Sequence, residues 1–328
     1  MNRNRREVLK GIFASTSALA MPSIVKAQAN RLVTLVVPYP PGGTSDIIGR
    51  LLAEQLGPMV GRQVIVDNRP GAGTAIGASY VARASGDGNT LLLGNVSTLS
   101  VNQWLYKKLP YDPVHDFAPI GLVAAVPLVV VVPSSMDVSK LADLVAAARA
   151  NKERLNYGSA GSGSPHHLAA EMFKAAAGVD LVHVPYKGTA PAIADLLSGN
   201  VQVVFSDIAP ALPHVRSGKL RALAVTSAGR QPTLAETPTV AESGIPGISS
   251  FDAVAWQCLV GPASMSREVV DSYAAALAQV MSKPSVRDNL LSKGVEPRSS
   301  NPAQLAKYIR DEAKHWGEVV KVSGVTLD

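Results

Sequence analysis

The chain has 328 residues, with 31 Lys and Arg against 25 Asp and Glu, and a formal net charge of +6. Residues 1–29 hold five basic and one acidic side chain, or +4 of this excess, which leaves about +2 on the remainder. A nearly neutral body with 5% aromatic residues offers neither the basic stripe nor the stacking platform that nucleic acids require, so we expect no nucleic-acid partner.

The N-terminus has the features of a twin-arginine export signal. Arg5 and Arg6 precede a weakly apolar stretch at residues 11–25, and the small residues Ala27 and Ala29 suit cleavage. The stretch is too short to span a bilayer, and polar residues and a proline interrupt it. We therefore expect residues 1–27 to be a twin-arginine signal peptide and the processed protein to be periplasmic.

Strand-like and helix-like segments alternate after the leader. The sequence predicts strands at residues 32–37, 63–66 and 90–93, and helices at residues 47–56, 75–84 and 100–107. This alternation is typical of a parallel sheet with helices on both faces. Two adjacent apolar runs at residues 120–126 and 128–132 follow, and Pro127 between them predicts a crossing strand and then the first strand of a second domain.

The alternation continues through the second domain. Predicted strands lie at residues 155–157, 182–184, 201–205 and 220–226, and predicted helices at residues 140–150, 165–177 and 190–197. An apolar run at residues 251–259 then returns the chain to the first domain, and the remainder is mostly helical. We predict two α/β domains, residues 30–126 with 229–328 and residues 127–228, with a ligand cleft between them. The lone Cys258 lies in an apolar run and is expected to be a buried small hydrophobe.

Small and polar residues follow three predicted strands of the first domain. The first strand leads into Tyr39-Pro40-Pro41-Gly42-Gly43-Thr44-Ser45-Asp46, the second into a turn with Ala72 and Gly73, and the third into Ser97. The N–H groups at such a turn and the dipole of the next helix favour an anion, and glycine lets a ligand approach the backbone. Strand ends of this kind face the ligand crevice of an open sheet, although glycine and serine also form turns without a ligand.

The second domain contains a similar run at residues 158–164. Ser164 is a suitable N-cap and Pro165 a suitable first helical residue, while the small residues before them suit a second polar or anionic group of a ligand. Lys187 either complements an anion or is solvated. His166 and His167 lack the spacing of a metal site, and we expect one of them to pack in the helix and the other to face solvent.

Four stretches carry a resemblance to a known family: residues 40–46 with Arg50, residues 68–73, residues 158–164 with His167 and Leu168, and residues 184–188. In this order they resemble the extracytoplasmic solute receptors of tripartite tricarboxylate transporters, the Bug or TctC family. The resemblance implies a two-lobed type II periplasmic-binding-protein fold. It also implies a carboxylate-bearing ligand held between the lobes and delivered to a membrane permease, by a monomer without catalytic residues, metal or cofactor.

Carried over to this sequence, the resemblance places ligand-binding residues in both lobes. They are Tyr39, Pro40, Gly42, Gly43, Thr44, Ser45, Asp46, Ala72, Gly73 and Ser97 in the first lobe, and Ser159, Gly161, Ser162, Gly163, Ser164, His166, Tyr186, Lys187 and Asp207 in the second. Asp207 could accept a hydrogen bond from a ligand amine or hydroxyl, or cap the helix that follows. Asp46 is expected to cap backbone N–H groups, because a carboxylate beside an anion is otherwise unfavourable.

Two alternative functions stay open. A GxGxxxG pattern at residues 71–77 is close to a dinucleotide fingerprint and would indicate an exported enzyme, but the acidic residue expected after the following strand is missing. Twin-arginine export of folded, cofactor-loaded proteins keeps this alternative open. The other alternative is an orphan ligand sensor that serves signalling. A serine hydrolase is not indicated, since none of the serines at residues 159–164 lies in a Gly-x-Ser-x-Gly pattern.

Overall fold

The computed structural model describes residues 32–150 and 155–327, and the predicted signal peptide at residues 1–27 lies outside them. The strands are β1 (Leu32–Val37), β2 (Gln63–Asn68), β3 (Thr90–Asn95), β4 (Phe117–Pro133), β5 (Leu155–Ser159), β6 (Leu181–Pro185), β7 (Val203–Asp207), β8 (Leu220–Val225), β9 (Val254–Pro262) and β10 (Glu296–Pro297). The α-helices are α1 (Thr44–Val60), α2 (Ala75–Ala82), α3 (Asn102–Leu105), α4 (Leu141–Ala150), α5 (Pro165–Ala177), α6 (Thr189–Ser198), α7 (Ile208–Arg216), α8 (Arg267–Ser282), α9 (Pro284–Leu291) and α10 (Pro302–Ser323).

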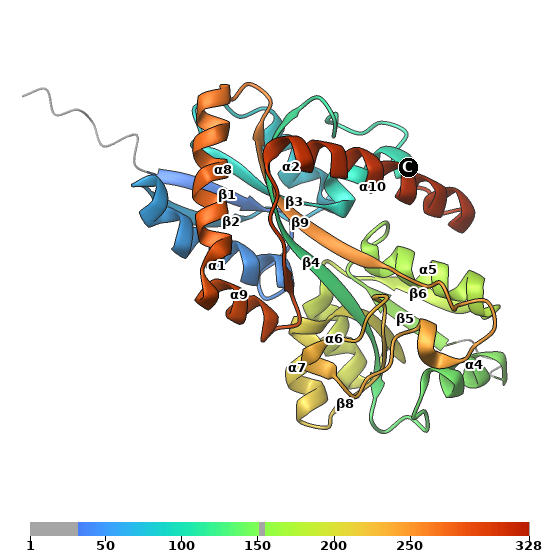
Figure 1. The fold of residues 1–328 in the computed structure, drawn as a ribbon. Helices are drawn as coiled ribbons and strands as arrows, with labels where there is room; N and C mark the ends of the chain where they lie inside the picture. Colours follow the sequence, from blue (N-terminus) through green and yellow to red (C-terminus); the bar gives the residue numbers. More distant parts are fainter. Residues whose placement is uncertain (1–31, 151–154, 328) are drawn as a thin grey trace, which may run out of the picture. The chain divides into compact units, whose positions relative to one another are not determined.

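The strands of the described residues join in one sheet with the order β2-β1-β3-β9-β4-β7-β5-β6, and β8 and β10 also pair with β4. Strand β1 is parallel to β2 and β3, and β5 is parallel to β6 and β7. Strand β9 is antiparallel to both β3 and β4, which it connects. Two parallel βα arrangements therefore share a central antiparallel pair, which consists of β4 and β9 (Figure 1). In this pair, residues 117–127 of β4 lie beside the whole of β9.

Strand β4 is a continuous strand of 17 residues, where the sequence predicted two separate ones. Pro127 pairs with Val254 as the last residue matched to β9, and Leu128 begins the pairing with β7. A proline lacks the N–H that a central ladder needs, but here it lies where the strand changes partners. The prediction that Pro127 separates two strands was wrong for this reason.

The buried apolar side chains form three clusters. One gathers residues 33–126 and 255–320 together with Leu168 of α5. The other two lie within residues 128–253, one containing Val130 and Val132 and the other Val129 and Val131 of β4. Because successive strand residues point to opposite faces, these two clusters cover the two faces of this half of the sheet. Cys258 is buried in the first cluster, as predicted.

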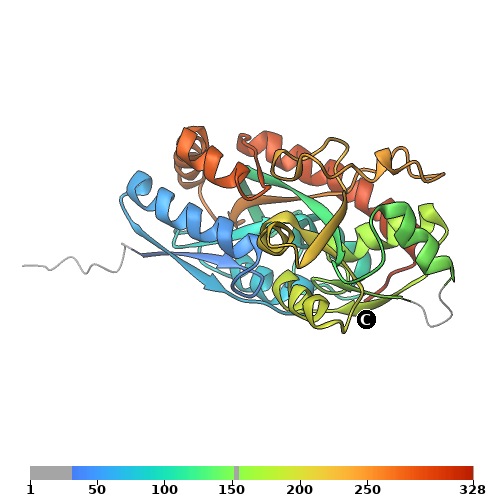
Figure 2. The same cartoon turned by 90° about the horizontal axis from the view of Figure 1, so that it is seen from below.

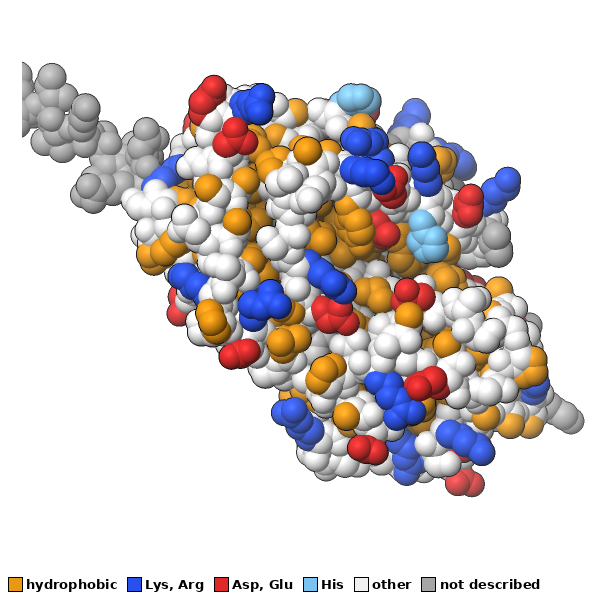
Figure 3. All heavy atoms as spheres, in the orientation of Figure 1, with side chains coloured by type: hydrophobic (Ala, Val, Ile, Leu, Met, Phe, Trp, Pro, Cys, Tyr) orange, Lys and Arg blue, Asp and Glu red, His pale blue; other side chains and the backbone are white. Residues whose placement is uncertain are grey.

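Helix α10 contacts elements from both halves of the sheet, including β4 and α5. In Figure 2 the C-terminal helices, coloured orange to red, lie along one side of the described unit, with β1 and β2 in blue on the other. Figure 3 shows basic and acidic side chains interspersed over the face that it presents. Among the described residues, every helix is too short or too polar to cross a membrane.

Most predicted elements form within a few residues of their predicted bounds, and helix α5 covers the predicted residues 165–177. The predicted helix at residues 100–107 is different, because β3 runs directly into a π-helix, η3 (Ser97–Val101), which continues as α3. The predicted strand at residues 251–259 begins only at Val254. The predicted division into two domains stays a prediction.

Candidate functional site

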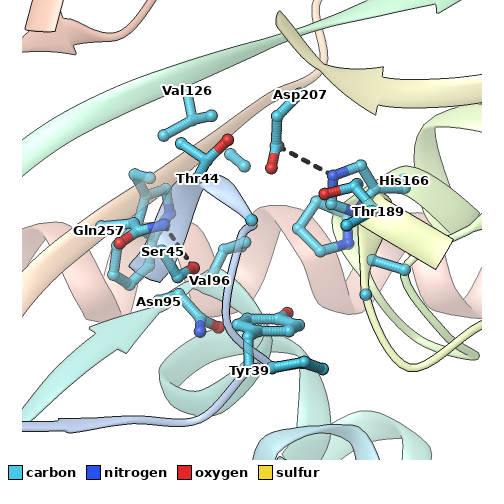
Figure 4. A pocket seen from close by; sticks show the side chains of 18 of the residues that line it. Tyr39, Thr44, Ser45, Asn95, Val96, Val126, His166, Thr189, Asp207 and Gln257 are labelled. Atoms are coloured by element: carbon cyan, nitrogen blue, oxygen red, sulfur yellow. Dashed lines mark hydrogen bonds and ion pairs between the residues drawn. The ribbon is translucent and has the colours of Figure 1, made fainter. Parts of the chain in front are cut away.

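A cavity of about 40 Å³ lies at the first turns of α1, α5 and α6. Its wall also takes residues from the end of β3 and from β9, together with Val126 of β4 and Asp207 at the end of β7. Figure 4 shows side chains from these elements converging on the cavity. The cavity thus combines residues that are more than 200 positions apart in the sequence.

The turn before α1 is organised by Asp46. The carboxylate of Asp46 accepts hydrogen bonds from the Gly42 N–H at 3.1 Å, from Asn68 Nδ2 at 3.0 Å and from Arg50 Nε at 3.0 Å. Burial alone would raise the pKa of Asp46, but these hydrogen bonds hold it below its usual value. Asp46 therefore caps the turn, as predicted, and it is not one of the residues that line the cavity.

Glycine has different roles at two neighbouring positions of this turn. Gly42 has φ +88°, a left-handed conformation that favours glycine. Gly43 has φ −86° and ψ 174°, which any residue can adopt, and it is the N-cap of α1 without a side-chain hydrogen bond. A Cβ added at Gly43 would lie 3.6 Å from Thr189 Oγ1 at the start of α6. This is an ordinary van der Waals distance, so neither the backbone angles nor a single Cβ requires glycine at position 43, and only a larger side chain would fill the space before α6.

Four buried polar atoms at the cavity have no hydrogen-bond partner among the described residues. They are Thr44 Oγ1, Asn95 Nδ2, His166 Nδ1 and Gln257 Oε1, on side chains that are 1%, 4%, 5% and 5% exposed. Buried polar groups in folded proteins are nearly always paired, and an unpaired one costs about 1–3 kcal/mol. Four such atoms around one cavity indicate that a ligand or ordered water completes their bonding.

Neighbouring groups determine which atom of Asn95 and of Gln257 faces the cavity in this structure. Asn95 Oδ1 accepts the Thr98 N–H at 3.1 Å, so the Asn95 amino group faces the cavity as a donor. Gln257 Nε2 donates to Ser45 Oγ at 2.7 Å, which leaves the Gln257 carbonyl oxygen as an acceptor. Because the Ser45 hydroxyl can donate as well as accept, the Gln257 amide can also turn over and present its amino group.

Asp207 forms a buried pair with His166, in which Asp207 Oδ1 lies 2.9 Å from His166 Nε2. A carboxylate can only accept, so Nε2 carries the hydrogen, and Nδ1 is an acceptor when the ring is neutral. Asp207 is also the N-cap residue of α7, but its side chain makes no capping hydrogen bond. Of the two predicted roles, capping the following helix is therefore not what the structure shows.

Helix N-termini dominate the electrostatics of the cavity. Thr44, His166 and Thr189 belong to the first turns of α1, α5 and α6, and each helix N-terminus carries about half a positive charge. Of the described residues that line the cavity, none is Lys or Arg. Burial raises the pKa of Tyr39 to about 12, and the nearby negative charge of Asp207 adds to the rise, so its hydroxyl stays neutral.

A second hollow of about 270 Å³ adjoins the cavity, and the two share Tyr39, Pro40 and Ala160. Its wall is formed by loops from both halves of the sheet, including Ala72, Gly73, Ser97, Gly161, Ser162, Ser164, Tyr186 and Lys187. Ala72 and Thr74 have φ +46° and +82°, which is a strained backbone for residues other than glycine. The Asn102 side chain holds this turn by donating to the Gly73 carbonyl at 2.8 Å.

The loop at residues 159–163 is supported from behind by two stacked histidines. His167 and His183 stack with ring centroids 3.9 Å apart, and both histidines in α5 are buried, so the prediction that one faces solvent was wrong. His183 Nε2 lies 2.6 Å from Ser159 Oγ, and the Gly163 N–H donates to His167 Nδ1 at 3.0 Å. Burial lowers the pKa of His167 to about 4 and that of His183 to about 3, so both rings are neutral near pH 7.

The predicted site residues therefore divide into three groups. Those at the cavity are Tyr39, Pro40, Gly43, Thr44, Ser45, His166 and Asp207. Those at the second hollow are Tyr39, Pro40, Ala72, Gly73, Ser97, Gly161, Ser162, Ser164, Tyr186 and Lys187. Gly42, Asp46, Ser159 and Gly163 line neither and instead shape the loops. Ser164 caps α5 by accepting the His167 N–H, as predicted.

Sequence reasoning missed Asn95, Thr189 and Gln257 as cavity residues. Gln257 is a polar residue within an apolar strand, and this was the signal that could have identified it. Gly77, the last glycine of the dinucleotide-like pattern, has a packing explanation, because a Cβ there would lie 3.0 Å from the Arg69 carbonyl oxygen and 3.1 Å from Pro38 Cβ.

Comparisons with known proteins agree with this geometry. The family model TctC, described as "Tripartite tricarboxylate transporter family receptor", matches residues 48–325. Protein BugT of Bordetella pertussis is 33% identical over 328 residues, which covers 100% of both chains. A structure of R. palustris Rpa4515 with adipate is 36% identical with a TM-score of 0.86, covering 90% of this chain and 98% of that one. The periplasmic binding protein BugD is 35% identical with a TM-score of 0.85 and the same coverage.

These likenesses confirm the predicted fold, which is that of the periplasmic solute-binding proteins. The family model spans the starts of α5 and α6 and strand β9, and the alignment with BugT also covers the turn before α1. The chain belongs to the TctC family of tripartite tricarboxylate transporter receptors.

Proposed function

We propose that this protein binds a small carboxylate-bearing ligand in the cavity and delivers it to the permease of a tripartite transporter. The observation that carries the proposal is the set of buried, unpartnered polar atoms around the cavity, of which Thr44 Oγ1 lies in the first turn of α1. The first amides of a helix have no intrahelical acceptor, and together with the helix dipole they form a ready site for an anion. The adipate bound to the R. palustris relative is a ligand of this chemistry.

A ligand carboxylate would lie against the first turn of α1. Asp46 already accepts the Gly42 N–H, so the amides of the first turn itself are those directed at the ligand. The Thr44 hydroxyl and the Asn95 amino group supply two further donors without a protein partner. Hydrogen bonds from such donors to a charged carboxylate are worth about 1.5–3 kcal/mol each, which is sufficient for recognition without a lysine or arginine.

Capture requires the walls of the cavity to move. A Cβ added at Gly188 would lie 3.3 Å from Pro40 Cδ, so the loops before α1 and α6 are nearly in contact. With these loops so close together, the cavity between them measures about 40 Å³. The ligand therefore enters while α1 and α6 are further apart, and its binding favours the closed form.

The moving parts are two lobes that divide at the two crossings of the chain. In this proposal the described residues up to Val126 form the first lobe with the chain from β9 onward, and residues 127–253 form the second. The apolar clusters support this division, because Val240 and Ile248 pack with the second lobe and the residues after Val254 with the first. We therefore propose that the chain returns to the first lobe near Val254, where the sequence predicted residue 229.

The remaining parts of the proposal concern the setting of the protein. The leader at residues 1–27 directs twin-arginine export, and the processed protein acts in the periplasm as a monomer that meets its permease in the closed form. Binding needs no cofactor and no catalytic group, because closure itself is the event that the partner recognises.

The test uses the processed protein purified from periplasm, whose N-terminal mass also reports cleavage after about residue 27. Thermal shift and calorimetry with mono- and dicarboxylates should give a higher melting temperature with one acid class, since a ligand at 100 times its Kd adds about 2.7 kcal/mol of stability. Gly43→Val should abolish this shift by filling the space before Thr189. The exposed loop variant Gly229→Val, where an added Cβ meets nothing within 4 Å, is the matched control. A protein that no carboxylate stabilises would refute the proposal.

A further inference from the structure

The cavity has a side rich in acceptors that the docking of a carboxylate does not use. Asp207 is 8% exposed and carries a negative charge, and His166 Nδ1 is a buried acceptor without a partner when the ring is neutral. Gln257 Oε1 is a third acceptor in the same wall. Asp207 already accepts a hydrogen bond from His166 Nε2, but a simple dicarboxylate brings only acceptors of its own and would supply no donor to any of the three groups.

The charged groups around the cavity also favour a ligand that carries a positive group. Of the described residues that line the cavity, Asp207 is the acid, and there is no Lys or Arg to balance it. The helix N-termini can balance one ligand carboxylate, but a second one beside Asp207 would place like charges together in a buried space.

We infer that the ligand is an amino acid whose carboxylate lies at the first turn of α1 and whose ammonium group donates to Asp207 and His166. This inference rests on the proposed function and names its ligand class. Thr44 and Asp207 line the same small cavity, so the two charged groups of a single small molecule can reach both (Figure 4). An ammonium group has three N–H donors and a positive charge that complements the Asp207 carboxylate.

His166 has a positioning role as well as a binding role here. Its Nε2–H donates to Asp207 Oδ1 and holds the carboxylate in one orientation, while Nδ1 is directed to the ligand. A dicarboxylate could bind this pair only with a proton, because a protonated ring donates from both nitrogens. Proton uptake on binding therefore distinguishes the two ligand classes.

The experiment compares acids that differ only by an ammonium group, using the processed protein and isothermal titration calorimetry. The pairs are aspartate with succinate, glutamate with glutarate, and alanine with propionate. We expect the amino acid of at least one pair to bind tenfold or more tightly than its partner, and to bind without proton uptake when measured in two buffers of different ionisation enthalpy. Asp207→Asn should reduce this ratio to near one, and the exposed-surface variant Asp311→Asn should leave it unchanged.

The outcomes distinguish a failure of this inference from a failure of the proposed function. If the acid without an ammonium group binds as tightly as the amino acid, or binds with uptake of a proton, the inference fails and the proposed function stands. If no member of any pair binds, the inference fails, and the wider carboxylate screen described above decides the proposed function. If the ratio is large but Asp207→Asn keeps it, Asp207 is not the group that recognises the ammonium, and the inference fails. The comparison of pairs on the unmodified protein needs no variant, so it stands even if Asp207→Asn does not fold.

Discussion

Replacing Thr44 by valine should weaken ligand binding without destabilising the protein. Valine keeps the branched shape of threonine, so the packing of the first turn of α1 is preserved. The Thr44 side chain is 1% exposed and its hydroxyl has no partner among the described residues, so the ligand-free protein loses no hydrogen bond. The melting temperature should stay the same or rise by up to about 2 °C, which corresponds to about 1 kcal/mol for a chain of this size.

The ligand-bound state responds in the opposite direction. A hydrogen bond to a charged carboxylate is worth about 1.5–3 kcal/mol, so the Kd should increase roughly 10- to 150-fold. Calorimetry gives the Kd, and thermal denaturation without ligand gives the stability. Thr226→Val is the matched control, because the buried Thr226 hydroxyl donates to Ala253 O at 2.6 Å and accepts the Leu128 N–H at 3.0 Å.

The control should lower the melting temperature by several degrees, since it leaves two buried backbone groups unpaired at about 1–3 kcal/mol each. A Thr44→Val variant that loses as much stability as Thr226→Val would show that the Thr44 hydroxyl is structural. An unchanged Kd in Thr44→Val would remove the first turn of α1 from the ligand site.

Three other predictions follow from the same structure. Ser164→Ala removes the cap of α5 and should cost about 1 kcal/mol in urea denaturation, a loss similar to that of the equivalent cap variant Ser266→Ala on α8. The pKa values of His167 and His183 are lowered by burial to about 4 and 3, so the unfolded chain binds more protons below pH 6.5. Stability should therefore fall as the pH drops from 6.5 towards 4, by up to about 1.4 kcal/mol per pH unit for each ring, and His183→Gln should flatten this slope; a stability that is constant over this range contradicts the assignment. Burial raises the pKa of the Cys258 thiol, so it should resist thiol reagents in the folded protein and react only on unfolding, and rapid labelling of the native protein would contradict its burial.

The alternation of apolar runs was sufficient to predict most of the fold. The helix at residues 165–177 was predicted with its bounds because its cap, its first proline and its terminal glycine are all local signals. The continuity of β4 could not be predicted in this way. A proline such as Pro127 normally ends a strand. It is tolerated here because Pro127 is the last residue paired with β9, opposite Val254, and Leu128 is the first residue paired with β7, opposite Asp207.

The site was predictable where it depends on loops and not where it depends on tertiary contacts. Thr44 and His166 follow recognisable turns, so the motif that contains them indicated a role. The importance of Gln257 depends on Ser45, which is 212 residues away in the sequence, and no local pattern reports that contact. The role of Asp207 was left open for the same reason, since only its partner His166 distinguishes a cavity wall from a helix cap.

The shared strand β4 has a mechanical consequence for a receptor with this function. Because one strand belongs to both halves of the sheet, separating the loops before α1 and α6 twists a strand and does not swing a flexible linker. Neighbouring strands accept a continuous range of twist, from about −10° to −35°. The ligand-free protein should therefore sample a continuous range of distances between these two loops. Ligand binding should narrow that range to the most closed conformations.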